Sequence, residues 1–283
     1  FNSIKNIYKD LTLLDATAFN NSPITTDMES LSKEIDTYAK NKKLELEALK
    51  IREEYRKEFI GNVSHELKTP LFTVQGYIST LIDGAAEDPQ IRDKYLKRAD
   101  KGIDRLTYIV KDLDMITKLE VGDANLTLET FNIIECITNV FDLLEIKAEK
   151  KNISLLLDKD YPTPIMVTAD RQRIQQVLTN LVVNSIKYGH QNGTTEISVE
   201  DLNSDKLIVR VTDNGEGVEN NHLTRLFERF YRVDKSGSRE EGGSGLGLSI
   251  VKHIIEAHEE KIYVESKLGI GSEFSFTLQK QTE

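Results

Sequence analysis

Apolar positions in the first part of the chain recur with the spacing of long amphipathic helices. From Asp27 to about Asp83 the sequence is rich in Glu, Lys, Leu and Ala, and its only proline is Pro70. The run Gly84-Ala-Ala-Glu-Asp-Pro89 then breaks this pattern. Asp88 is the expected N-cap of a second helix, with Pro89 at its first position. We therefore predict two long helices joined by a short loop, the second of which runs to about Glu120.

These helices carry their apolar residues on one face. On the second helix the stripe consists of Ile91, Tyr95, Leu96, Ala99, Ile103, Leu106, Ile109, Val110 and Leu113. A helical hairpin with one half-covered apolar face is most simply completed by a second copy, which predicts a homodimer built around a four-helix bundle. On the first helix the seven-residue pattern slips between Tyr38 and Leu46, as a coiled-coil stutter would. This pattern favours a paired signalling helix over a single solvated one.

From Leu126 onward the pattern changes to alternating strands and helices, after the run 121–125 that is expected to end the second helix. The predicted strands are Ile153–Leu157, Glu196–Glu200, Leu207–Thr212, Lys261–Ser266 and Glu273–Leu278. The predicted helices are Ile133–Lys150, Asp170–Tyr188, His222–Phe230 and Leu246–His258. We therefore expect a multidomain fold: an all-α hairpin in a dimeric four-helix bundle, followed by an α+β domain of the α/β-sandwich type.

Composition narrows the class of protein. The 283 residues suffice for two domains, and the net charge of −10 argues against nucleic acid as a partner. No run approaches the ~18 apolar residues that span a bilayer. Because the chain starts at Phe1 without a signal-type leader, we expect a cytoplasmic fragment of a longer protein. Cys136 is the only cysteine, which excludes an intramolecular disulfide and favours a reducing compartment.

A histidine with unusual neighbours lies in the first long helix. His65 is followed by Glu66, and Thr69 lies one turn later on the same face. Pro70 lacks a backbone N–H, so a kink is expected at this turn. A nucleophile, a carboxylate and a hydroxyl within one turn indicate a reactive site rather than a structural histidine.

Polar residues also gather on one face of the helix predicted at 170–188. Asn180, Asn184, Lys187 and Tyr188 share this face, opposite an apolar one. Amide oxygens at positions i and i+4 and a lysine one turn on suit Mg²⁺ and the polyphosphate that it accompanies.

Three glycine-containing runs follow. Asp213-Asn-Gly215-Glu-Gly217 directly follows a predicted strand, where a carboxylate can accept a hydrogen bond from the exocyclic amine of adenine. Gly242-Gly-Ser-Gly-Leu-Gly-Leu248 leads into a helix and can bind phosphate through backbone N–H groups under a mobile lid. Gly269-Ile-Gly271-Ser-Glu-Phe274 is expected to be a hairpin turn.

Together these motifs resemble a known family. The run Phe59-Ile-Gly-Asn-Val-Ser-His-Glu-Leu-Lys-Thr-Pro-Leu71 resembles the phosphoacceptor box of bacterial two-component sensor histidine kinases, within them the phosphate-regulon sensor kinase group. The later motifs resemble the ATP-binding domain shared by histidine kinases, gyrase, heat-shock chaperone ATPases and mismatch-repair ATPases, the GHKL class. Leu226-Phe-Glu-Arg-Phe-Tyr-Arg232 resembles the phenylalanine box of the histidine-kinase branch.

The resemblance implies roles residue by residue. The catalytic set would be His65 as phosphoacceptor, Glu66 as general base, Thr69 as a residue that orients water, and Arg232 near the phosphates. Asn184 would be the Mg²⁺ ligand. The ATP-binding set would be Asn180, Asn184, Lys187, Tyr188, Asp213, Gly215, Gly217, Gly243, Gly245, Leu246 and Gly247. Two departures from the family pattern are Ser185 in place of alanine and Glu259-Glu260 in place of a glycine pair after His258.

The implied domains are a signalling helix at 1–45, with the end of a HAMP-like segment as one interpretation, a dimerisation and histidine phosphotransfer domain at 46–122, and an ATP-binding domain at 126–281. The implied function is autophosphorylation of His65 from Mg-ATP and transfer to an aspartate of a separate response regulator, with dephosphorylation of that regulator as a second activity. The full-length protein is expected in the bacterial inner membrane, which it would reach only through a segment outside this chain. A phosphatase-dominant sensor and an ATP-driven conformational switch remain alternatives.

Overall fold

A computed structural model describes residues 28–120, 126–233 and 245–281. The chain divides into two units, the first ending at Asn62 and the second beginning at Val63. In the first unit the described residues form the beginning of helix α3, which runs from Met28 to Ile82 and continues into the second unit. The predicted helix Asp27–Asp83 is thus confirmed.

The first unit leaves its apolar side chains exposed. They are Ile35, Leu44, Leu46, Leu49, Ile51, Tyr55 and Ile60. Its polar residues make local contacts, such as the ion pair of 2.7 Å between Lys42 Nζ and Glu45 Oε2, which spans less than one helical turn. The paired signalling helix stays a prediction, because a single chain does not test it.

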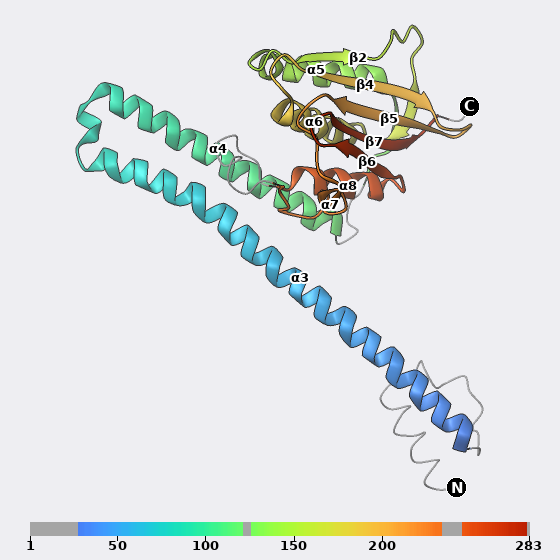
Figure 1. Cartoon of the computed structure of the whole chain (residues 1–283). Coiled ribbons are helices and arrows are strands. Elements are labelled where there is room, and N and C mark those ends of the chain that lie inside the picture. The colour runs from blue at the N-terminus through green and yellow to red at the C-terminus, as the bar shows by residue number, and fades with distance from the viewer. Residues whose placement is uncertain (1–27, 121–125, 234–244, 282–283) are drawn as a thin grey trace. The chain divides into compact units, whose positions relative to one another are not determined.

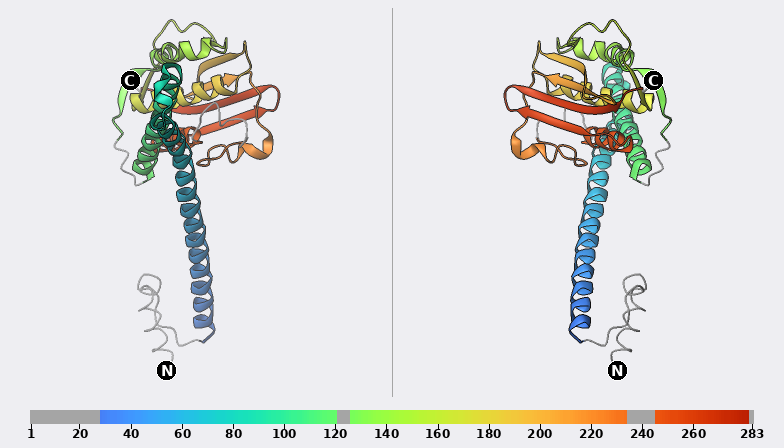
Figure 2. Two further views of the ribbon diagram at one scale, coloured as in Figure 1. Left: turned by 90° about the vertical axis from the view of Figure 1, so that its left-hand side faces the viewer. Right: turned by 90° about the vertical axis from the view of Figure 1, so that its right-hand side faces the viewer.

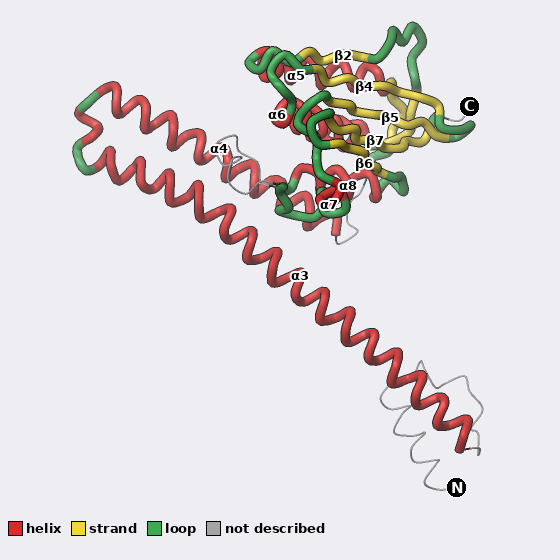
Figure 3. The backbone as a smooth tube through the Cα atoms, viewed as in Figure 1, coloured by secondary structure: helices red, strands yellow, loops and turns green. Residues whose placement is uncertain are grey.

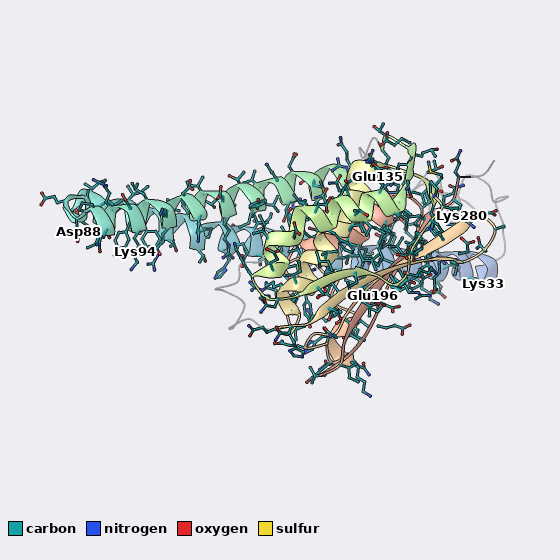
Figure 4. The ribbon with its side chains drawn as sticks, turned by 90° about the horizontal axis from the view of Figure 1, so that it is seen from above. Lys33, Asp88, Lys94, Glu135, Glu196 and Lys280 are labelled. Atoms are coloured by element: carbon teal, nitrogen blue, oxygen red, sulfur yellow. The ribbon has the colours of Figure 1, made fainter. Side chains whose placement is uncertain are left out.

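The second unit begins with a helical hairpin (Figures 1 and 3). The rest of α3 leads through the 3₁₀ helix η1, Ala85–Glu87, into α4, Pro89–Glu120. Asp88 lies at the loop end of this hairpin (Figure 4), and its Oδ1 accepts a hydrogen bond from the Gln90 N–H at 2.8 Å. The predicted N-cap is therefore confirmed. Helix α3 is continuous through Pro70, and the kink expected there stays a prediction.

A five-stranded sheet forms the centre of the following domain. Its order is β2-β4-β5-β7-β6, with β2 parallel to β4 and the other neighbours antiparallel. The bounds are Ser154–Leu157 for β2, Thr194–Asp201 for β4, Lys206–Asp213 for β5, Ile262–Lys267 for β6 and Gly271–Gln279 for β7. All five predicted strands are confirmed.

Sequence reasoning missed a second, two-stranded sheet. Strand β1, Glu129–Asn132, pairs antiparallel with β3, Met166–Ala169. Neither four-residue sequence shows an alternating apolar pattern, so the two strands are defined by their pairing rather than by their own sequences.

Helices α5, Ile133–Glu149, α6, Arg171–Tyr188, and α8, Gly247–Ala257, lie on one side of the five-stranded sheet (Figure 2). Side chains cap the N-termini of α5 and α6. Asn132 accepts a hydrogen bond from the Ile134 N–H at 3.2 Å, and Asp170 accepts one from the Arg173 N–H at 3.0 Å. The core between helices and sheet is closed and includes Ile137, Val140, Ile174, Leu178, Leu181, Val209, Ile250, Ile254 and Phe276.

One predicted helix is wrong. The segment expected to be helical from His222 to Phe230 forms only the short helix α7, Asn220–Leu223, followed by turns. Phe230 has a positive φ of 61°, and its N–H donates to the Gly245 carbonyl at 2.9 Å. This long-range contact holds the segment in a turn and overrides its local helical pattern.

The expected fold class is confirmed, since a helical hairpin precedes an α/β sandwich. The homodimer stays a prediction. Within the described ranges, every helix is either too short or too polar to cross a membrane.

Candidate functional site

The His65 turn lies on α3, and the His65 side chain is exposed. Pro70, one turn further on, is buried. Because proline has no N–H, the Glu66 carbonyl loses its usual donor four residues on. The Thr69 hydroxyl donates to the carbonyl of His65, the residue before Glu66, at 3.2 Å. His65 and Thr69 are therefore both at the surface of the same turn, as the sequence predicted, and Thr69 is tied to the backbone through its proton.

Among the described residues, Glu66 makes no hydrogen bond to the His65 side chain. Its Oε2 pairs instead with Arg105 Nη2 of α4 at 3.3 Å, and both side chains are half-buried. Sequence reasoning missed Arg105, because the two residues are 39 positions apart and no sequence pattern indicates their pairing.

The second group of candidate residues surrounds the end of β5. Asp213 is the last residue of this strand, and its Oδ1 accepts from the Gly215 N–H at 2.9 Å and the Ser272 N–H at 3.3 Å. Burial raises the pKa of the Asp213 carboxyl, whereas the two N–H groups and His190 act in the opposite direction. The result is a half-buried carboxylate with a fixed orientation, suited to accept a hydrogen bond from a ligand.

The loop after Asp213 is docked onto the turn between β6 and β7. The Glu216 carbonyl accepts from the Gly269 N–H at 2.6 Å, and the Val218 N–H donates to Ser266 Oγ at 2.8 Å. Gly217 has a φ of 66°, and a Cβ there would collide with the Lys267 carbonyl. This position therefore requires glycine. The first and third of the three glycine-containing runs thus form one structure, which the turn signals alone did not predict.

Helix α6 contributes the polar face that the sequence predicted. Asn180, Asn184 and Lys187 are partly buried, and Lys187 Nζ lies 4.9 Å from the centre of the exposed Tyr188 ring. Asn180 Nδ2 approaches the Gly247 carbonyl at 3.4 Å, which joins this face to the first residue of α8. Partly exposed amide oxygens one turn apart fit a magnesium ion, which takes oxygen ligands and retains several waters.

Lys151 is a further residue that sequence reasoning missed. Its Nζ donates to the Lys187 carbonyl at 2.7 Å, in the last turn of α6. Helix ends leave carbonyl groups without intrahelical donors, so this contact stabilises the turn that presents Lys187 and Tyr188.

Of the glycine-rich run 242–248, the structure describes residues 245–248. Gly245 has a φ of 72°, and a Cβ there would contact the Phe230 backbone. Leu246 is fully buried, and Gly247 starts α8. Arg232 is partly buried at the end of the preceding segment. Gly243 lies outside the described residues.

Both departures from the family pattern have local explanations. The Ser185 hydroxyl lies 2.5 Å from that of Thr195 in the core, so it links α6 to β4. Glu259 takes the left-handed conformation, with a φ of 59°, that a glycine would favour. Glu260 is buried, pairs with Lys206 Nζ at 2.7 Å and accepts from the Thr277 hydroxyl.

Two other histidines make structural contacts in the sandwich. His258 Nε2 accepts from the Asp170 N–H at 3.0 Å, which leaves Nδ1 as the donor to the Ile254 carbonyl at 2.8 Å. It thereby joins the end of α8 to the start of α6. His222 Nδ1 lies 2.6 Å from the Tyr231 hydroxyl.

Two family models match the chain. The "His Kinase A (phospho-acceptor) domain" matches residues 55–122. The "Histidine kinase-, DNA gyrase B-, and HSP90-like ATPase" matches residues 169–282. The hairpin and the sandwich therefore define a protein that joins a phospho-acceptor domain to an ATPase-type domain. The wider domain limits expected at 46–122 and 126–281 stay predictions.

Individual relatives are histidine kinases, in agreement with the two family models. The sensor histidine kinase WalK of Bacillus subtilis is 35% identical over 232 residues, which cover 81% of this chain and 37% of the relative. WalK of Staphylococcus aureus is 33% identical over 80% of this chain. Among solved structures, histidine kinase AdeS of Acinetobacter baumannii has a TM-score of 0.62 at 28% identity, over 77% of this chain and 98% of that one.

The histidine kinase ThkA, solved in complex with the response regulator TrrA, has a TM-score of 0.66 at 30% identity, over 82% of this chain and 64% of that one. The chain therefore belongs to the two-component sensor histidine kinases. The chain spans 37% of the length of the Bacillus subtilis relative and 54% of that of the Staphylococcus aureus relative.

Proposed function

We propose that this chain autophosphorylates His65 with the γ-phosphoryl group of ATP. The observation that carries the proposal is one exposed histidine in a phospho-acceptor hairpin, on the same chain as the oriented Asp213 carboxylate and the polar face of α6. The relative ShkA was solved in complex with AMPPNP, which supports ATP as the nucleotide.

In the proposed reaction a nitrogen of His65 attacks the γ-phosphorus, the bond to the β-phosphate oxygen breaks and ADP leaves. The ring proton passes to a base, for which Glu66 is the nearest carboxylate in sequence. Asp213 would accept from the adenine amine, and Lys187 and Arg232 would neutralise phosphate charge. Asn184 would hold a magnesium ion, which when bound neutralises polyphosphate charge.

The phosphoryl group would then pass to an aspartate of a response regulator, as the complex of ThkA with TrrA suggests for a relative. Thr69 would orient water for the reverse task, dephosphorylation of that regulator. We further propose that the chain acts as a homodimer through the apolar face of its hairpin. Placement of the whole protein in the bacterial inner membrane stays a prediction.

The test is autophosphorylation with γ-labelled ATP and Mg²⁺, in the wild type, His65→Gln and Asn184→Asp. Acid-labile, alkali-stable label is expected on the wild type and on neither variant. His65→Gln should still bind ATP, whereas Asn184→Asp should bind it with altered Mg²⁺ dependence. ATP hydrolysis without label on His65 would instead favour an ATP-driven switch. Rapid dephosphorylation of a phosphorylated regulator without such label would favour a phosphatase-dominant sensor.

A further inference from the structure

We propose that Arg105 is a positioning residue that holds the Glu66 carboxylate away from His65, so that their ion pair must open before phosphoryl transfer. This inference rests on the proposed function, because it assigns a resting state to the base of that reaction. It concerns only residues of the hairpin in the second unit.

The ion pair lies between the two helices of the hairpin. Arg105 Nη2 of α4 approaches Glu66 Oε2 of α3 at 3.3 Å. The exposed fractions of the two side chains are 30% and 21%, so the pair is neither fully buried nor freely solvated. The Glu66 carboxylate is thereby drawn towards α4.

Helix packing fixes this arrangement. Gly102 lies one turn before Arg105, and a Cβ there would collide with the Val74 side chain and lie 3.8 Å from the Pro70 carbonyl oxygen. Pro70 and Val74 are buried, so the two helix backbones come close at this level. Because Pro70 follows Glu66 by one turn, the same close approach sets the register in which Glu66 meets Arg105.

His65 points elsewhere. Consecutive residues of a helix are about 100° apart around its axis, so neighbouring side chains do not face each other. His65 is exposed, and within the described residues no hydrogen bond or ion pair joins it to Glu66. For Glu66 to take the ring proton, its side chain must turn towards His65, and this movement separates it from Arg105.

Opening such a pair requires little free energy. Ion pairs that retain partial exposure contribute modestly to stability, since water and salt screen them. A small shift of α3 against α4 would therefore suffice to release Glu66. We expect that loss of Arg105 raises the rate of phosphorylation about two- to fivefold, the factor that corresponds to such a pair.

The experiment measures the initial rate of His65 labelling at several ATP concentrations in the wild type, Arg105→Gln, Arg105→Lys and Arg92→Gln. Arg105→Gln should be about two- to fivefold faster at saturating ATP with an unchanged KM for ATP. Arg105→Lys keeps the charge and should lie between it and the wild type. Arg92→Gln is the matched control, since Arg92 is on the same helix and pairs with its neighbour Asp93 at 3.3 Å; its rate should equal that of the wild type.

A second background tests whether Arg105 acts through Glu66. The double variant Glu66→Gln with Arg105→Gln should be no faster than Glu66→Gln alone, even if both are inactive. Thermal melts followed by circular dichroism check that each variant is folded, and Arg105→Lys replaces Arg105→Gln if the latter is not.

If the wild type is labelled and Arg105→Gln is labelled no faster, the proposal is wrong. A slower rate for Arg105→Gln would mean that Arg105 holds Glu66 in its working position. Acceleration that persists in the Glu66→Gln background would also overturn it. Absence of label on the wild type would refute the proposed function itself, which distinguishes the two failures.

Discussion

The hairpin and the sandwich differ in how far they bury similar apolar side chains. Phe276 of the sandwich is 0% exposed, whereas Ile103 of the hairpin is 51% exposed. The sandwich completes its core with its own helices and sheet, so its geometry is set within one chain. The hairpin leaves one apolar face, which includes Ile103, exposed in the single chain. Its helices can therefore adjust to a partner that covers this face. A rigid sandwich and a more adjustable hairpin thus follow from how completely each region buries its apolar residues.

The largest effect is expected in the closed core. Phe276→Ala should reduce the free energy of unfolding of the sandwich by about 3–5 kcal/mol, because it removes a fully buried aromatic ring and leaves a cavity. Ile103→Ala is the comparison, and it should leave this transition nearly unchanged. Chemical denaturation of the two variants measures both values. Equal losses would show that the two regions are not distinct in the way described.

The next largest effect is expected on the exposed apolar face of the hairpin. Ile103→Glu should weaken self-association by roughly 2–4 kcal/mol, because a charge would be buried without a partner between two copies. Leu143→Glu is the control, since Leu143 of α5 is equally apolar and 63% exposed. Analytical ultracentrifugation gives the dissociation constants. If both variants stay dimeric, or the wild type is a monomer, the hairpin face is not the dimer interface.

Asp213→Asn should weaken ATP binding about tenfold or more, because the acceptor that we propose for the adenine amine loses its charge. Without nucleotide the variant should be as stable as the wild type at pH 7.5 or more so, since Asn Oδ1 can still accept from Gly215 and Ser272. Burial raises the pKa of Asp213 in the folded protein. Protonation therefore favours folding at low pH, and this contribution is lost as the pH rises through the folded pKa.

The stability advantage of Asp213→Asn should accordingly shrink as the pH falls to about 4, near the ordinary pKa of aspartate. Thermal melts at both pH values, with calorimetric titration of ATP, measure the two effects. A variant that binds ATP normally and melts earlier at pH 7.5 would assign Asp213 a purely structural role.

The smallest effect is at the turn after α8. Glu259→Gly should stabilise the protein by about 0.5–1 kcal/mol, because glycine adopts the positive φ of this position without a steric penalty. Glu256→Gly, the same change inside the preceding helix, should destabilise it by about 1 kcal/mol. Urea titration of both variants gives the values, and two changes of the same sign would contradict the argument.

The sequence alone determined the parts that depend on local pattern. Helical spacing located both hairpin helices, and Asp88 before Pro89 marked the start of the second. The five strands of the central sheet and the polar face of α6 were also evident, because their apolar and polar residues follow short-range patterns. The roles of His65, Asn184 and Asp213 came from motif resemblance, and they stay proposals.

Only the tertiary structure decided which distant residues meet. The pairing of β1 with β3 and the contacts of Arg105 with Glu66 and of Lys151 with the Lys187 carbonyl join positions far apart in sequence. Phe230 was expected in a helix, yet its contact with Gly245 holds it at a positive φ. The physical reason is the same throughout: local rules specify how a segment folds, whereas packing against a partner chooses between conformations that differ by only a few kcal/mol.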